Sequence, residues 1–249
     1  MAVETQSPWL RRYAPARTPR LRLLCLPHAG GTASFFHSWG NAFGPDVEVV
    51  VARYPGRLER IVEPFLGTIE EMADALVEVV AARTDVPLAI FGHSMGASIG
   101  YELTLRLGER HGIAPSLLMV SGRRPPHTVA PSAEELDEEG VIAEVRRLGG
   151  TDAALFDDPA LRELVVPAIQ ADFAAVRAYR ARPGVPLPCP VVGYVGDGDP
   201  EVDLADIGRW ADLAPRGFDA VGFPGDHFYL LDQRDRLVED IRARLVPGR

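Results

Sequence analysis

The stretch that decides the fold is "AIFGHSMGAS", residues 89–98. It runs apolar up to Phe91 and then places Ser94 between Gly92 and Gly96, in the pattern G-x-S-x-G. In a nucleophile elbow this pattern turns sharply from a strand into a helix and exposes the serine hydroxyl at the edge of a sheet. Glycine is needed on both sides because larger residues would collide in so tight a turn. Five residues can match this pattern by chance, so the flanking sequence has to show whether Ser94 lies in such an elbow.

The flanking sequence alternates between strand-like and helix-like segments. Short apolar runs that are typical of buried strands occupy 21–27, 47–55, 86–92, 115–123, 189–200 and 218–230. The first segment predicted to be helical opens after Gly30 and Gly31 and carries Trp39. The others are 68–83, with Thr68 as its N-cap, 97–110, 206–213 and a last helix from about Arg234. Such alternation predicts a mostly parallel central sheet with helices on both faces. Together with the elbow it predicts the α/β-hydrolase fold.

The alternation stops between Pro125 and about Pro183, where no strand pattern occurs. Two acidic, amphipathic stretches, 138–149 and 158–179, predict helices there instead. We therefore expect a helical insertion at about 125–185 that lies at the carboxyl ends of the strands, where ligands bind in such folds, and acts as a lid. The predicted organisation is a loose N-terminal lead-in, 1–19, followed by a single domain, 20–249.

Composition narrows the function. The chain of 249 residues has a net charge of −9, and all its basic side chains are arginines, which argues against nucleic acid as a partner. No run approaches the ~18 uncharged apolar residues of a membrane helix, and the N-terminal stretch lacks the apolar core of a signal peptide. We expect a cytoplasmic protein without a membrane partner. Cys25 and Cys189 adjoin apolar runs, which favours buried free thiols, and no zinc-ligand spacing occurs, so we predict neither a metal nor a cofactor.

A serine nucleophile needs a base, and the base needs an orienting acid. In α/β-hydrolases these follow in the order Ser, Asp or Glu, His. Of the six histidines, only His227 follows a strand-end carboxylate that itself comes after Ser94 in the chain. It lies in the loop after the last apolar strand. The preceding strand ends in "VGDGDP", which offers Asp199, the preferred acid, and Asp197 as the alternative.

An oxyanion hole needs two backbone N–H donors aimed at the developing negative charge. The residue after the nucleophile, Met95, supplies one in this fold. The loop "PHAGG", 27–31, follows an early strand and would supply the other through Ala29. His28 precedes Ser94 in the chain and therefore has the wrong order for the base, so we expect it to support this loop.

Taken together, the motifs resemble those of the type II thioesterases, the free-standing editing enzymes of polyketide synthases and nonribosomal peptide synthetases. The resemblance extends from about residue 20 to 240 and rests on "LLCLPHAGGTASFFHSW" (23–39), "VARYPGRLER" (51–60), "FGHSMGASIGYEL" (91–103), "VSGRRPP" (120–126), "VGDGDP" (195–200) and "GDHFYLL" (225–231). The insertion is the part least well matched, so it does not indicate substrate preference.

This resemblance implies a serine thioesterase that hydrolyses acyl groups from the phosphopantetheine arm of an acyl or peptidyl carrier protein and so removes aberrant or stalled chains. It implies Ser94 as nucleophile, His227 as base, Asp199 as orienting acid, and Met95 and Ala29 as oxyanion donors. The alternatives are a carboxylesterase or lipase on oxygen esters, since the same triad cleaves both, and a catalytically inactive scaffold of the same fold.

Carrier proteins of these systems are generally acidic, and this chain is acidic as well. Docking would then need a local patch of arginines to overcome the general repulsion. The candidates are Arg123 and Arg124, which precede the insertion, and Arg57 and Arg60 in "PGRLER". For the second pair, a structural salt bridge that fixes the loop is the alternative interpretation.

Overall fold

The computed structural model describes residues 7–14, 18–133, 136–149, 156–182 and 185–245. In this part of the chain one sheet of seven strands has the order β1-β3-β2-β4-β5-β6-β7. The strands are β1 (Leu10–Arg12), β2 (Leu21–Leu26), β3 (Val47–Ala52), β4 (Leu88–His93), β5 (Leu117–Ser121), β6 (Val191–Gly196) and β7 (Phe218–Phe223). All neighbours pair in parallel except β1, which runs antiparallel to β3. This sheet, with its helices, confirms the predicted α/β-hydrolase fold class.

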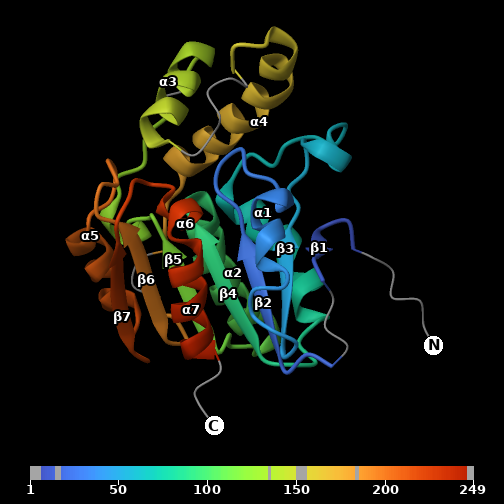
Figure 1. Cartoon of the computed structure of the whole chain (residues 1–249), viewed down its shortest axis with the longest axis vertical. Helices are drawn as coiled ribbons and strands as arrows, with labels where there is room; N and C mark the ends of the chain where they lie inside the picture. The colour runs from blue at the N-terminus through green and yellow to red at the C-terminus, as the bar shows by residue number, and fades with distance from the viewer. Residues whose placement is uncertain (1–6, 15–17, 134–135, 150–155, 183–184, 246–249) are drawn as a thin grey trace.

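The central strands are buried on both faces, which explains why they read as continuous apolar runs. In β2, Leu24 and Leu26 pack into one cluster and Leu23 and Cys25 into the other. The first cluster contains α1 (Ile69–Ala81), α2 (Met95–His111), α5 (Leu204–Gly208) and η5 (Arg209–Leu213). The second contains η1 (Ala33–Trp39), α6 (Tyr229–Asp232) and α7 (Arg234–Leu245). Figure 1 shows the resulting sheet with helices in front and behind.

Local sequence sets the ends of the helices that position the site. Thr68 caps α1, its hydroxyl accepting a hydrogen bond from the Glu71 amide at 3.0 Å, as predicted. The helix α2 leaves the elbow and ends at Gly112, which has the left-handed conformation with φ 66°. The segment at 33–39, expected to be an ordinary helix, is a 3-10 helix. Two further short 3-10 helices are η2 (Leu58–Arg60) and η3 (Pro126–Thr128).

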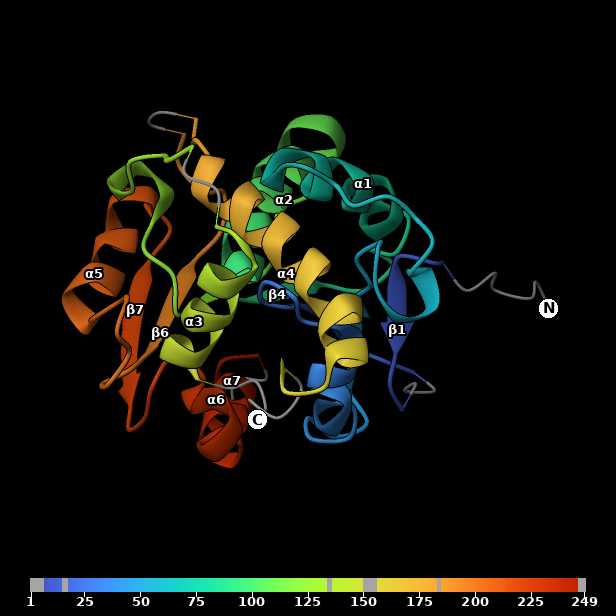
Figure 2. The ribbon, with the colours of Figure 1, turned by 90° about the horizontal axis from the view of Figure 1, so that it is seen from above.

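Between β5 and β6 the chain forms two helices, α3 (Glu138–Leu148) and α4 (Pro159–Ala178). They share a small apolar cluster of their own, which includes Val141, Val145 and Ile169. Seen from above, both helices lie across the edge of the sheet (Figure 2). Residues 134–135, 150–155 and 183–184 of the expected insertion fall outside the described residues.

The prediction of a loose lead-in over 1–19 is wrong for residues 10–12. They form β1, in which Leu10 is buried and pairs with Ala52 of β3. Arg12 of this strand forms a salt bridge with the buried Glu48 at 3.2 Å. A strand of three residues is too short to show an alternating pattern in the sequence. Residues 1–6 and 15–17 of the lead-in lie outside the described part.

Cys25 and Cys189 are both buried and free, as expected. Among the described residues, no helix combines the length and the apolar character that crossing a membrane requires.

Candidate active site

The elbow is formed at the end of β4, in the middle of the sheet. Ser94 has φ 53° and ψ −117°, an unusual backbone conformation for a residue with a side chain. Such strain costs of order 1–3 kcal/mol and persists only where the surrounding structure enforces it. Here the Ser94 amide donates to the Ser121 carbonyl on β5 at 2.8 Å, and the Ser94 carbonyl accepts from Ala97 at 2.9 Å. These bonds tie the turn to the neighbouring strand and to α2.

Both glycines of the elbow are required by close packing of the backbone. A Cβ on Gly92 would fall far inside van der Waals contact with the Gly96 carbonyl. A Cβ on Gly96 would collide in the same way with the carbonyl of Leu26 at the end of β2. The pattern G-x-S-x-G therefore allows α2 to start directly against β2 and β4.

His227 lies in the loop after β7 and is fully buried. Its Nδ1 forms a hydrogen bond of 2.7 Å with Oδ2 of Asp199, whose side chain is also fully buried. Asp199 follows β6, and its Oδ1 accepts from the Glu201 amide, which fixes the carboxylate. With the proton on Nδ1, Nε2 carries the free lone pair. That Nε2 is buried and has no hydrogen-bond partner among the described residues.

Asp197, the alternative acid, is placed differently. It is exposed, and its Oδ1 accepts the Gly225 amide at 3.0 Å. The structure therefore brings Asp199, and not Asp197, to His227. Asp226 turns back on its own loop and accepts the Phe228 amide at 2.8 Å.

Two other histidines surround His227. The ring of His93 lies 5.0 Å from that of His227, and its Nδ1 is 3.0 Å from the Ser121 hydroxyl, which in turn is 2.7 Å from the Tyr229 hydroxyl. His28 packs edge-on against Phe35. Burial, and then the neighbouring His227, lowers the pKa of His28 to about 3 and that of His93 well below its ordinary value. Both side chains therefore stay neutral at neutral pH.

The loop 27–31 follows β2 and faces the elbow. Its Gly30 amide donates to Asp172 at 2.7 Å and its Gly31 amide to the His28 carbonyl at 2.9 Å. The Ala29 amide has no acceptor among the described residues. Met95 is the first residue of α2, so its amide has no intrahelical acceptor either. Within the described part of the chain, neither of the two amides predicted as oxyanion donors has a hydrogen-bond acceptor.

Ser94 and His227 line one pocket of about 200 Å³. The loop 27–31 contributes to its wall, and α3 and α4 cover it with apolar side chains. The lining residues are His28, Ala29, Gly30, Thr32, Ser94, Val145, Leu148, Val165, Ile169, Phe173, His227 and Phe228. The pocket therefore brings Ser94 and His227 together beneath an apolar wall.

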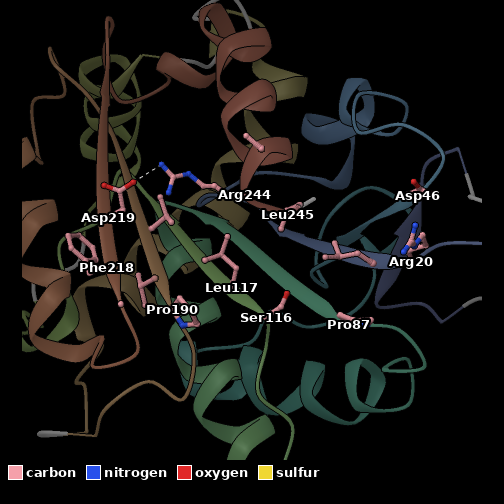
Figure 3. A pocket seen from close by; sticks show the side chains of 15 residues that line it. Arg20, Asp46, Pro87, Ser116, Leu117, Pro190, Phe218, Asp219, Arg244 and Leu245 are labelled. Atoms are coloured by element: carbon pink, nitrogen blue, oxygen red, sulfur yellow. Dashed lines mark hydrogen bonds and ion pairs between the residues drawn. The ribbon is translucent and has the colours of Figure 1, made fainter. Parts of the chain in front are cut away.

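A larger hollow of about 860 Å³ lies at the opposite edge of the sheet (Figure 3). It is lined by the first residues of the strands, such as Leu117, and by the end of α7. Asp219 and Arg244 there neutralise each other at 2.7 Å. The hollow lies at the amino ends of the parallel strands, and in such folds the functional groups gather at the carboxyl ends. We therefore place the chemistry in the smaller pocket.

The arginines considered for docking differ in accessibility. Arg57 and Arg60 are 8% and 5% exposed and form salt bridges with Asp172 and Glu63, so the structural interpretation is correct for them. Arg123 is half-buried and donates to the Ser98 hydroxyl at 3.1 Å.

Arg124 is exposed, although it pairs with Asp206 at 2.9 Å. Of the four arginines it is the most accessible, with 48% of its side chain exposed.

Sequence reasoning missed Asp172, which is 1% exposed and contacts both Arg57 and Gly30. It lies on α4 three residues after Ile169 and three before Ala175, both of which are buried. A single acidic residue on the apolar face of a predicted helix is the signal that could have identified it, because a buried carboxylate requires a partner.

The fold, the elbow and the buried His–Asp pair define an α/β-hydrolase. A sequence model of the "Thioesterase domain" family matches residues 21–245. The thioesterase PikA5 of Streptomyces venezuelae is 41% identical over 247 residues, which is 97% of this chain and 86% of that protein. The solved type II thioesterase BorB of the borrelidin cluster is 39% identical, with a TM-score of 0.88 over 96% of this chain and 98% of the other. For YbtT, a type II thioesterase of the yersiniabactin pathway, the identity is 29% and the TM-score 0.83 over 94% and 96%.

The chain therefore belongs to the thioesterase family, and its relatives place it among the type II thioesterases of polyketide and nonribosomal peptide biosynthesis.

Proposed function

We propose that this type II thioesterase hydrolyses acyl groups held as thioesters on the phosphopantetheine arm of acyl or peptidyl carrier proteins. The proposal rests on the buried His227. Its Nδ1 is hydrogen-bonded to Asp199, and its Nε2 has no partner among the described residues. His227 and Ser94 line the same pocket. The names of relatives such as the gramicidin S biosynthesis protein GrsT and the thioesterase PikA5 support the same setting.

In the proposed reaction each of these residues has a distinct role. Ser94 Oγ attacks the thioester carbonyl while His227 Nε2 accepts the hydroxyl proton, and Asp199 stabilises the imidazolium that forms. The amides of Met95 and Ala29 bind the oxyanion of the tetrahedral intermediate. The arm leaves as a thiol after accepting the proton from His227. A thiolate is a better leaving group than an alkoxide because the pKa of an ordinary thiol is only roughly 8.5.

Hydrolysis of the acyl-enzyme repeats the sequence with water as nucleophile. His227 takes a proton from the water, the oxyanion again rests on the two amides, and Ser94 leaves with the proton that His227 returns. The product is a free acid, and the carrier protein regains its free thiol. Such release would clear stalled or aberrant chains from an assembly line.

A direct test compares one acyl group presented in three forms: on a carrier protein, on a small thiol and on an alcohol. We expect kcat/KM to fall in that order. A preference for the oxygen ester over both thioesters would contradict the proposal and favour a carboxylesterase. Equal values for the carrier protein and the small thiol would retain the thioesterase chemistry but contradict the carrier protein as partner.

Docking on the carrier would use the exposed Arg124. Replacing it with glutamate should raise KM for the acyl carrier protein and leave KM for the small thioester unchanged. An equal change for both substrates would contradict this docking role.

A further inference from the structure

The carboxylate of Asp172 connects three parts of the chain that are distant in sequence. It projects from α4 and is 1% exposed. Its Oδ2 accepts the Gly30 amide at 2.7 Å and Nη1 of Arg57 at 2.6 Å, and its Oδ1 accepts Nη2 of Arg57 at 2.9 Å. A helix of the insertion is thereby bonded directly to the loop that carries Ala29.

A second contact from the same face of α4 restricts this loop. Gly30 has φ 73°, and a Cβ there would collide with Ile169, one turn before Asp172. On the other side, Arg57 also donates to the carbonyls of Gly31, at 3.4 Å, and Pro55, at 3.3 Å. The loop is therefore held between Ile169 and Asp172 on α4 and Arg57 on the loop after β3.

Charge explains why Arg57 accompanies Asp172. An oxyanion hole stabilises developing negative charge, and a buried, unpaired carboxylate beside it would oppose that charge. The bidentate guanidinium neutralises the carboxylate and leaves its hydrogen bond to Gly30 in place. Burial alone would lower the pKa of Arg57, but the hydrogen bonds and charge of Asp172 raise it above its ordinary value, so Arg57 stays charged.

We infer that Asp172 and Arg57 are positioning residues for the oxyanion hole: they fix the loop so that the Ala29 amide points at the substrate carbonyl. The inference rests on the proposed function and adds that the reaction depends on where α4 sits. The amide of Gly30, already bonded to Asp172, is not a donor to the substrate.

The chain offers a matched control at the end of the same helix. Tyr179, directly after α4, donates its hydroxyl to Oε1 of Glu102 at 2.6 Å, and Glu102 is 1% exposed. This bond also anchors α4 to the body through a buried carboxylate, but it does not contact the loop 27–31. Tyr179→Phe should therefore lower Tm without changing the chemistry.

The experiment measures kcat, KM and Tm for wild type, Asp172→Asn, Arg57→Lys and Tyr179→Phe with a small acyl thioester. It also measures the affinity for an acyl trifluoromethyl ketone, which forms a tetrahedral oxyanion on the serine, and for the product acid. For Asp172→Asn we expect kcat to fall roughly 10- to 100-fold, less than the loss of a whole oxyanion donor. KM and affinity for the acid should stay near wild type, while affinity for the ketone falls with kcat.

Arg57→Lys keeps the positive charge but not the bidentate geometry, so its losses should be smaller and in the same direction. The inference is overturned if folded Asp172→Asn keeps the wild-type kcat and ketone affinity, or if it loses no more than Tyr179→Phe. Should Asp172→Asn fail to fold, Arg57→Lys decides by the same criteria. A wild type that does not cleave the thioester would instead overturn the proposed function.

Discussion

Oδ2 of Asp199 lies 2.7 Å from Nδ1 of His227, and both side chains are fully buried. A hydrogen bond of this kind, shielded from water, fixes the ring and the tautomer with the proton on Nδ1 and the lone pair on Nε2. The exposed Asp197, two residues earlier on the same strand end, instead supports the Gly225 amide. The two carboxylates of "VGDGDP" therefore have different roles.

Asn at position 199 would keep the shape of the side chain but favour the His227 tautomer with the proton on Nε2. We expect Asp199→Asn to lower kcat by roughly 10⁴-fold, the size of the loss when a triad acid is replaced in this way. Asp197→Asn keeps an oxygen that can accept the Gly225 amide, so kcat should stay close to wild type. Steady-state kinetics on a small thioester separates the two. A larger loss in the Asp197 variant would assign the acid to the other carboxylate.

Two glycines of α2 should respond in opposite ways to the same substitution. Gly96→Ala places a methyl group against the Leu26 carbonyl and should destabilise the fold by about 3 kcal/mol, the upper end of the usual cost of overpacking. Among the described residues beyond its own turn of helix, the nearest atom to a Cβ added on Gly108 is 3.9 Å away. Gly108→Ala should therefore stabilise the fold by about 0.5–1 kcal/mol through better helix propensity. Urea unfolding of both variants measures the difference, and equal effects would contradict the packing described for the elbow.

Acid should weaken the fold through His28. Its pKa is lowered from 6.5 to about 3 by burial and then by His227 and Arg57. The unfolded chain therefore binds a proton near pH 6.5 that the folded protein does not bind until about pH 3. Stability contributed by the neutral ring is complete above pH 6.5 and falls by about 1.4 kcal/mol per pH unit below it.

His28→Phe removes this titration and keeps an aromatic ring against Phe35 and Phe228. Its free energy of unfolding should fall less than that of wild type between pH 6.5 and pH 5. Part of the wild-type loss should persist in the variant, because the pKa of His93 is also lowered by burial. Urea unfolding at the two pH values tests this, and identical losses would refute a neutral His28.

The two helices of the insertion should differ in hydrogen exchange. The second half of α4 is anchored by Asp172 and, just beyond its end, by Tyr179. The buried residues of α3, such as Val141 and Val145, belong mainly to the small cluster shared with α4. We expect 172–178 to exchange as slowly as α2, and α3 to exchange faster. Protection of α3 equal to that of β4 would contradict a lid movement of this helix.

The sequence predicts the fold and the pairing of Asp199 with His227 because both depend on local patterns. Apolar runs mark strands that are buried on both faces, and the glycines around Ser94 are fixed by backbone collisions within a few residues. The order of strand ends then places the elbow, Asp199 and His227 at one edge of the sheet.

The contacts that depend on distant segments were not predictable. Asp172 meets Arg57 across 115 positions of the chain, and no local pattern specifies that pairing. The strand β1 is three residues long and pairs with a strand more than thirty residues later, so its burial becomes visible only in the folded protein. Arg57 and Arg60 could likewise be docking or structural residues until their burial was known.

Incubating an acyl-phosphopantetheinyl carrier protein with wild type or with Ser94→Ala, and recording the intact mass of the carrier, tests directly whether Ser94 releases the acyl group. We expect wild type to remove the acyl mass and leave the free phosphopantetheine arm, and Ser94→Ala to leave the acyl group in place. An acyl group that survives wild type, or one that Ser94→Ala removes at the wild-type rate, would contradict a thioesterase that depends on Ser94.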